Sequence, residues 1–184
     1  AGDKESSKST PGIFIALTGP NSFYPLNAIS KKQTCVSHST PEAEIVAANA
    51  AIRTEGLPAL ELWEMVLGRK IDLILLEDNT ATMQVLKSGK NPTMRHMGRT
   101  HRVDVLWLHE VFKEPWLHLF YEKSAFMRAD IFTKGFVQPD KLSLILICRF
   151  RRSSLSPTWR LPYCCCNPTL LTSTPSLSHY SYLA

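Results

Sequence analysis

Short apolar runs alternate with stretches of helical periodicity over the first 140 residues of the chain. Ile13–Leu17 is an apolar run with a Pro/Gly pair on each side, which predicts a strand, and Leu26–Gln33 is its expected partner. Ile71–Leu76 is almost continuously apolar, as strands buried on both faces are. Trp116–Tyr121 alternates well enough to predict a further strand.

Helical signals occupy the intervals between these runs. The Ser-Thr-Pro-Glu sequence at 39–42 predicts a helix start, because a hydroxyl cap, an early proline and an acid near the positive end of the helix dipole agree. Gly56 and Pro58 are expected to kink or break this helix before a second amphipathic stretch, Leu60–Leu67.

Further helices are expected in the second half of the same region. One follows the Glu-Asp-Asn sequence at 77–79 and runs to about residue 87, one spans about 99–113, and a short one begins near Arg128. Strands that alternate with helices in this way predict an α/β fold with a mixed sheet.

Composition and charge divide the chain into two parts. With 184 residues, 44% of them hydrophobic, the chain can form one modest domain with a core, or a smaller domain plus loose ends, and a wholly disordered or collagen-like protein is excluded. All 16 acidic residues lie at or before Asp140, so the whole formal net charge of +5 arises in the segment 141–184. The net charge is therefore a property of that segment, and we discount it as a sign of nucleic-acid binding.

The segment 141–184 has no sustained helical or strand periodicity. Its three adjacent cysteines, at 164–166, fit no zinc-binding spacing, and the odd total of five cysteines argues against a disulfide framework. We therefore expect a domain over residues 1–140 and a disordered or weakly ordered tail over 141–184.

Three acidic residues occupy positions that suit catalytic carboxylates. Asp78 follows a buried strand, at the edge of an α/β sheet where ligands usually bind. Glu44 lies in the first turns of a capped helix, and Asp130 lies at the start of a late helix. Each position alone is equally explained as a favourable partner of a helix dipole. If the three side chains converge, their oxygens suit Mg²⁺ or Mn²⁺, but the spacing does not establish that they converge.

A stretch of basic residues between 87 and 102 contains no acid. Such a stretch is a candidate for sequence-independent contact with a phosphate backbone, and the alternative is a solvated, charged surface loop. The candidate residues are Lys87, Lys90, Arg95, Arg99, His101 and Arg102. Trp63, Trp107 and Trp116 are expected to pack in the core rather than to stack on bases.

Five short motifs occur in a recognisable order. They are Lys-Lys-Gln at 31–33, Ser-Thr-Pro-Glu-Ala-Glu at 39–44, Glu-Asp-Asn at 77–79, Arg-Thr-His-Arg-Val-Asp-Val at 99–105 and Ala-Asp-Ile-Phe-Thr-Lys at 129–134. In this order they closely resemble the ribonuclease H domain at the end of reverse transcriptase in copia-type retrotransposon polyproteins. The Lys-Ser-Thr-Pro-Gly sequence at 8–12 is similar to the Arg-Ser-Thr-Ser-Gly segment of that family. The resemblance covers about residues 1–136.

The resemblance implies a fold, an activity and a set of site residues. The family fold is a ribonuclease H-like mixed sheet of five strands flanked by helices, and its activity is cleavage of RNA in RNA–DNA hybrids. By correspondence with the family motifs, Glu44 (rather than Glu42), Asp78 and Asp130 would be catalytic and would hold two Mg²⁺ or Mn²⁺ ions. One ion helps to generate the attacking hydroxide, and the other stabilises the leaving oxygen.

The resemblance also implies partners and a location. The partners would be an RNA–DNA hybrid and the reverse transcriptase and integrase portions of the same polyprotein, and the location would be the cytoplasm or a virus-like particle. No membrane partner is expected, because no apolar run reaches the roughly 18 residues of a membrane span and no signal peptide is visible.

One departure from the family pattern concerns its first strand. The first metal-binding aspartate of the family lies there, in an Asp-x-Asp-Trp segment just before the residues that match Ala1-Gly2-Asp3. We therefore expect the first strand to be largely missing, metal binding and activity to be weak, and the sheet edges to be re-paired or covered. The alternatives are a non-catalytic retroelement remnant or nucleic-acid-binding module, and an unrelated structural α/β domain.

Overall fold

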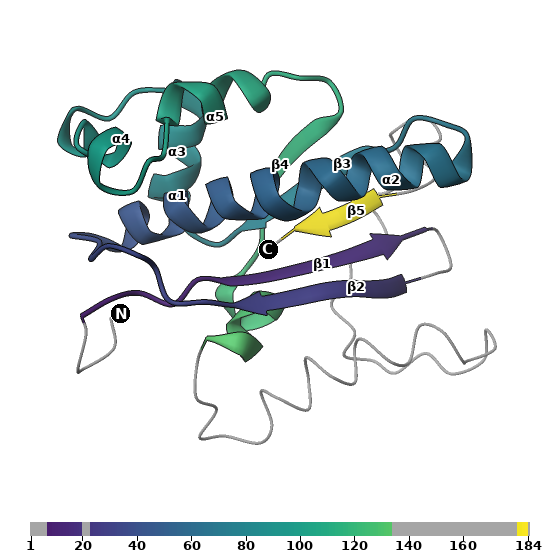
Figure 1. The fold of residues 1–184 in the computed structure, drawn as a ribbon, viewed down its shortest axis with the longest axis horizontal. Helices are drawn as coiled ribbons and strands as arrows, with labels where there is room; N and C mark the ends of the chain where they lie inside the picture. The colour runs from purple at the N-terminus through teal and green to yellow at the C-terminus, as the bar shows by residue number, and fades with distance from the viewer. Residues whose placement is uncertain (1–6, 20–22, 134–179, 184) are drawn as a thin grey trace.

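The computed structural model describes residues 7–19, 23–133 and 180–183, and the structural statements below refer to these residues. They form a mixed five-stranded sheet with the strand order β2-β1-β5-β3-β4. The helices α1 to α5 gather on one side of β1 and β2 (Figure 1). The predicted α/β class with a mixed sheet is confirmed.

Strands β1 and β2 form an antiparallel hairpin at one edge of the sheet. β1 spans Gly12–Thr18 and β2 spans Phe23–Ser30, with a register irregularity between Ile15 and Ala16. The first strand lies where the apolar run predicts it. The second is shifted by three residues from the predicted 26–33, and it includes Pro25, which an edge strand tolerates because one row of its amides needs no partner strand.

Strands β3 and β4 are parallel neighbours on the other side of the sheet. β3 spans Asp72–Glu77 and β4 spans Leu117–Tyr121, close to both predictions. The middle of β3, at residues 73–75, is almost completely buried, as its continuous apolar run predicts. Since the two strands are parallel, their carboxyl ends lie at the same edge of the sheet.

A continuous helical run carries the chain from residue 40 to residue 67 (Figure 1), so of the predicted kink or break at Gly56 and Pro58 the break is wrong, and a π-helical irregularity lies there instead. The run consists of α1 (Thr40–Ala50), the π-helical η1 (Ala51–Gly56) and α2 (Leu57–Leu67). The amide of Leu57 bonds to the carbonyl of Ile52, five residues back. This wider turn admits the proline, whose ring would clash with the carbonyl four residues back in an α-helix.

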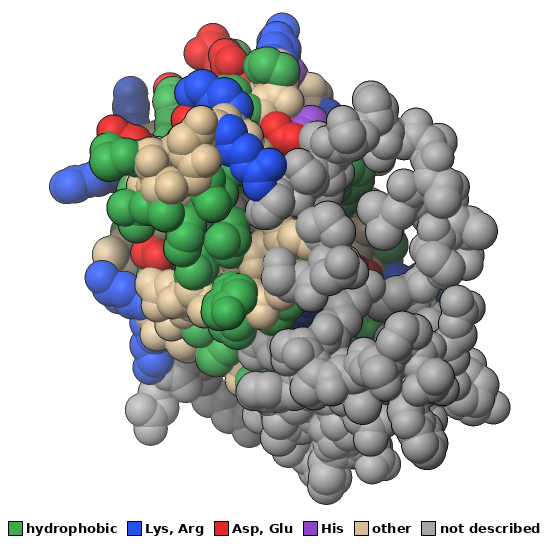
Figure 2. Space-filling view, turned by 90° about the vertical axis from the view of Figure 1, so that its right-hand side faces the viewer, with side chains coloured by type: hydrophobic (Ala, Val, Ile, Leu, Met, Phe, Trp, Pro, Cys, Tyr) green, Lys and Arg blue, Asp and Glu red, His purple; other side chains and the backbone are tan. Residues whose placement is uncertain are grey.

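Helix α2 has one face in the core and one face in solvent. Trp63 packs against the core, as do Trp107 and Trp116, so the predicted packing role of these tryptophans is confirmed. Leu62, Met65 and Val66 are exposed instead. Figure 2 views the end of the molecule at which α2 lies and shows hydrophobic side chains gathered on that surface.

The single helix predicted over 99–113 is two short helices. After α3 (Thr80–Ser88) come α4 (Met97–Thr100) and α5 (Val105–Val111). Between α4 and α5, Arg102 has a φ of +56°, in the left-handed region, and the chain reverses its course. Asp104 then starts the new helix, because its side chain accepts hydrogen bonds from the amides of Leu106 and Trp107.

Between residues 23 and 133, three short 3₁₀ segments join the helices and strands. They are η2 (Pro92–Met94), η3 (Ser124–Phe126) and η4 (Arg128–Phe132), and the last is the short helix predicted to begin near Arg128 and to contain Asp130. η4 lies directly against β1, because a Cβ added at Gly12 would meet the carbonyl oxygen of Ala129 at 2.6 Å. Only a glycine allows so close an approach between the two backbones.

The centre of the sheet is filled by a strand from the far end of the chain. β5 spans Tyr180–Leu183 and runs antiparallel to β1 and parallel to β3. It pairs with residues 15–18 of β1 and 72–75 of β3, so the sheet edges that we expected to need a partner are paired along that length. The rest of the predicted tail, 141–179 and 184, lies outside the described residues.

The core lies on both faces of the sheet. Ile13 and Ile15 of β1 join the larger cluster, which includes residues of α1, β3, α3 and α5. The alternate residues Phe14 and Ala16 point the other way and pack with Met127 and Ala129 around η4. Burial on both faces holds η4, and with it Asp130, in place beside β1.

Candidate functional site

The three predicted acids line one cavity of about 680 Å³. Glu44 comes from α1, Asp78 from the residues that follow β3, and Asp130 from η4. Each of the three is half-buried. Three separate elements therefore bring these side chains to one place; we call this cavity the carboxylate pocket.

Local sequence explains why each acid arrives there. Ser39 caps α1 by accepting a hydrogen bond from the amide of Glu42 at 3.3 Å, which starts the helix and places Glu44 in its second turn. Asp78 follows the last residue of β3, at the carboxyl edge of the sheet. The hydroxyl of Ser124 donates to Oδ2 of Asp78 at 2.5 Å and so orients that carboxylate.

A fourth acid, Glu77, also lines the carboxylate pocket, and the sequence reasoning missed it. It is only 7% exposed. Burial raises the pKa of Glu77 to about 8, and the negative charges of Glu44 and Asp78 act in the same direction. The amide of Asn79 opposes them by donating to Oε1 of Glu77 at 3.1 Å. The sequence signal for Glu77 was its position as the last residue of an apolar strand that is buried on both faces, since such burial extends to the end of the strand.

The donor chemistry of the pocket fits a hard divalent cation. Carboxylate oxygens are the ligands that Mg²⁺ and Mn²⁺ prefer, and Glu44, Asp78 and Asp130 contribute them to the lining of the pocket. Lys32 also lines the pocket. Among residues 7–19, 23–133 and 180–183, no group of three His, Cys, Asp or Glu side chains is arranged so that it could hold an ion as it stands.

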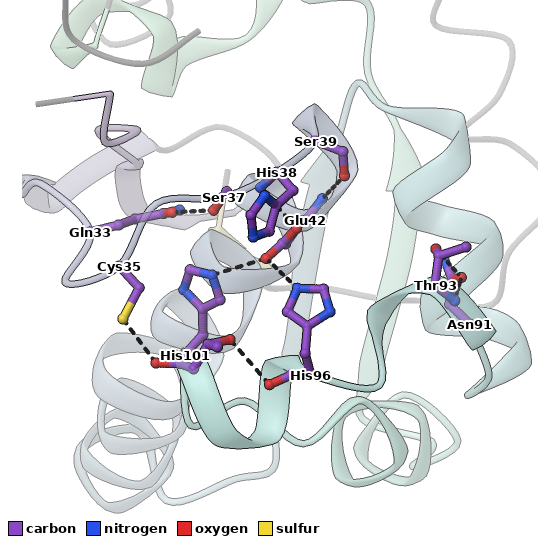
Figure 3. Close-up of polar contacts among 11 residues, drawn as sticks. Gln33, Cys35, Ser37, His38, Ser39, Glu42, Asn91, Thr93, His96 and His101 are labelled. Carbon is purple, nitrogen blue, oxygen red and sulfur yellow. Dashed lines mark hydrogen bonds and ion pairs between the residues drawn. The ribbon is translucent and has the colours of Figure 1, made fainter.

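The first turn of α1 also carries a buried carboxylate on another side, which the sequence reasoning did not single out. Oε1 of Glu42 lies 3.0 Å from Nε2 of His96 and 3.0 Å from Nε2 of His101 (Figure 3). Oε2 of Glu42 accepts a hydrogen bond from the amide of His38 at 3.0 Å. The His38 and His96 rings meet edge to face, with centroids 5.5 Å apart. We call Glu42, His96 and His101 the carboxylate–histidine cluster.

Burial and hydrogen bonding act in opposite directions on Glu42. Its side chain is only 2% exposed, and burial by itself would raise its pKa. The hydrogen bonds from His96, the amide of His38 and His101 outweigh burial and hold the pKa of Glu42 below its ordinary value. Glu42 is therefore a buried anion that three donors satisfy.

The predicted nucleic-acid-binding residues fall into two groups. The side chain of His101 is 1% exposed and is bound to Glu42, so it is not a surface contact. The other five are exposed: Lys87, Lys90, Arg95, Arg99 and Arg102. The basic stretch is thus not uniformly at the surface, because one of its predicted contact residues is buried against Glu42.

Comparisons with protein-family models, with curated proteins and with solved structures found no match to this chain. None of the helices in the described part of the chain combines the length and the apolar character that crossing a membrane requires.

Proposed function

We propose that this chain is a ribonuclease H-like domain of a copia-type retrotransposon polyprotein, and that the carboxylate pocket is a nuclease site for RNA in RNA–DNA hybrids. The observation that carries the proposal is the convergence of Glu44, Asp78 and Asp130 on one cavity. These residues are far apart in sequence, and each lies in one of the motifs that resemble the family.

The pocket residues have separate roles in the proposed reaction. Glu44, Asp78 and Asp130 would hold Mg²⁺ or Mn²⁺, which when bound supplies an activated water and stabilises the leaving oxygen of the phosphodiester. Ser124 keeps Asp78 oriented through its hydrogen bond. Gly12 allows η4 to approach β1 closely enough to bring Asp130 to the pocket.

The exposed bases between 87 and 102 supply the proposed contact with the duplex. Phosphate contacts by Lys and Arg are independent of sequence and weaken as salt rises, which suits an enzyme that acts on any hybrid. The implied partners are an RNA–DNA hybrid and the reverse transcriptase and integrase portions of a longer polyprotein.

A cleavage assay tests the proposal. The chain is incubated with an RNA–DNA hybrid, single-stranded RNA or duplex RNA, in Mg²⁺, in Mn²⁺ or in EDTA. We expect slow, metal-dependent cleavage of the RNA strand in the hybrid alone. Glu44→Gln and Asp78→Asn should each lower the rate at least about 100-fold, because bound metal contributes several kcal/mol to the transition state and 1.4 kcal/mol is a factor of ten. The matched control is Glu61→Gln on the exposed surface of α2.

A second candidate function is hybrid binding without cleavage. The exposed bases favour it, since within the described residues none of Lys87, Lys90, Arg95, Arg99 and Arg102 forms an ion pair with an acid. Tight, salt-sensitive binding of the hybrid with no cleavage in either metal would support this candidate and contradict the nuclease proposal. Cleavage that survives both carboxylate substitutions would place the nuclease elsewhere.

A further inference from the structure

The segment that carries the exposed bases is held to the body of the protein at a few buried points. Met97 and Val103 belong to the core and are almost completely buried. Between and beside them, His96 and His101 both reach the carboxylate of Glu42 on α1 (Figure 3). The backbone carbonyl of Thr100 also accepts a hydrogen bond from the thiol of Cys35 at 2.9 Å.

The two histidines bracket α4, and the bases lie beside them in sequence. Arg95 precedes His96, Arg99 lies within α4, and Arg102 follows His101. The two residues that bind Glu42 therefore lie next to or within three positions of all three arginines along the chain.

A second cavity lies against this segment. A hollow of about 700 Å³, formed by the segment 89–104 and the start of α5, is lined by Lys90, Arg95 and Arg102, and it shares no lining residue with the carboxylate pocket. Asp104 lines it too, but its carboxylate already accepts the amides of Leu106 and Trp107. The charge that this hollow presents is therefore mainly positive.

Glu42 and Glu44 both lie in the first turns of α1 but face different parts of the molecule. Two residues along an α-helix correspond to a rotation of about 200°, so the two side chains leave the helix on nearly opposite sides. Glu44 lines the carboxylate pocket, and Glu42 faces the two histidines. One rigid helical turn thus connects the pocket to the basic segment.

The hydrogen-bond chemistry of the cluster is suited to holding a fixed geometry. The carboxylate of Glu42 can only accept, so each Nε2 must carry a hydrogen and donate it. Nδ1 of His101 is buried without a partner among the described residues, so Nε2 is the ring nitrogen through which His101 bonds. Charge-assisted hydrogen bonds of this kind are stronger than neutral ones and constrain both rings.

We propose that Glu42 is a positioning residue, which holds Arg95, Arg99 and Arg102 in a fixed arrangement for the phosphate backbone of a nucleic-acid duplex. The inference rests on the nucleic-acid binding in the proposed function but not on cleavage. Glu42 touches neither the substrate nor the cation in this scheme. It acts through His96 and His101.

The direction in which Glu42→Ala changes the affinity for nucleic acid separates the positioning role from a purely electrostatic effect. Glu42→Ala removes a negative charge, and charge alone would then strengthen the binding of a polyanion. Loss of the anchor should instead weaken binding of an RNA–DNA hybrid about tenfold, because three long side chains must then be ordered on binding. The affinity is measured in EDTA by fluorescence anisotropy over a series of salt concentrations. Glu61→Ala, an exposed acid of α2, is the matched control and should leave affinity unchanged or slightly raised.

Two further measurements cover the case in which Glu42→Ala unfolds the chain. His96 is 37% exposed, so His96→Ala should fold and should lower the affinity by a smaller factor. His96→Gln keeps an N–H donor and should recover most of the wild-type affinity. If His96 acted only through the contacts of its ring, this variant would bind as weakly as His96→Ala. Amide exchange in residues 97–104 should be faster in His96→Ala than in the wild-type chain.

The outcomes for and against are distinct. Folded Glu42→Ala or His96→Ala chains that bind the hybrid as tightly as wild type overturn the positioning role. A wild-type chain that does not bind the hybrid overturns the proposed function, whereas unchanged amide exchange in 97–104 overturns the anchor itself.

Discussion

The Nε2 atom of His101 lies 3.0 Å from Oε1 of Glu42, and both side chains are almost completely shielded from solvent. In sequence the two residues belong to different motifs, one at a helix start and one in a basic stretch. The stretch between 87 and 102 contains no acid of its own, but in the folded molecule a carboxylate from elsewhere in the chain lies against it. The compensating carboxylate comes from α1.

Acid should weaken this pairing. Since its pKa lies below the ordinary value of 4.5, Glu42 contributes stability that is fully present above pH 4.5 and is lost as the pH falls through the lowered pKa. Glu42→Gln should cost about 1–3 kcal/mol at neutral pH, because hydrogen bonds to a buried charge are replaced by weaker ones. Urea unfolding at neutral pH and well below pH 4.5 measures both effects. A cost that is equally large at the two pH values would contradict this account.

Glu77 should have the opposite pH dependence. Its pKa of about 8 lies above the ordinary 4.5, so its contribution is fully present below pH 4.5 and is lost as the pH rises to 8. The free energy of unfolding should fall by up to about 1.4 kcal/mol per pH unit across that window. Glu77→Gln should remove this decline and be more stable than wild type above pH 8. Thermal unfolding over the window tests it, and parallel profiles for the two proteins would refute it.

Gly12→Ala should disturb the carboxylate pocket from a distance. The added Cβ would lie 2.6 Å from the carbonyl oxygen of Ala129 and 2.6 Å from Cγ2 of Thr133, so η4 must move and Asp130 with it. We expect a loss of about 1–3 kcal/mol of stability. Metal-dependent cleavage should fall more than hybrid affinity does.

Gly98→Ala is the control for that substitution. Its added Cβ would meet nothing closer than the carbonyl oxygen of Val103 at 3.9 Å, within the short helix α4. Stability should stay the same or rise by up to about 1 kcal/mol, because alanine is the better helix former. If both substitutions had equal effects on cleavage, the close contact between β1 and η4 would not be what positions Asp130.

Tyr182→Pro should destabilise the whole sheet. The strand β5 pairs with β1 on one side and with β3 on the other. Proline at position 182 removes one backbone N–H from this central strand, and central strands do not tolerate that loss. We expect a cost of about 3 kcal/mol, as for a proline inside a helix. Tyr182→Phe keeps the amide and serves as the control. Equal stability of the proline variant and wild type would show that β5 does not hold the sheet together.

Much of the local structure could be predicted because its causes are local. The apolar runs that become β1 and β3, the capped start of α1 and the Asp-Asn turn before α3 each contain their own signal within a few residues. At Gly56 and Pro58, where a kink or break was predicted, the helix continues through a π turn, because a π turn that tolerates the proline has no sequence signature of its own. Likewise, the helix over 99–113 divides because Asp104 caps a new start.

The sequence by itself determined the α/β alternation, the strands on either side of the sheet and the three acids worth examining. Only the tertiary structure decided that those acids line one pocket, that Glu77 joins them as a buried acid, that Glu42 binds two histidines and that β5 enters the sheet between β1 and β3. The physical reason is that periodicity and capping act between residues close in the chain. Burial, hydrogen bonding across elements and strand pairing depend instead on which distant segments meet when the chain folds.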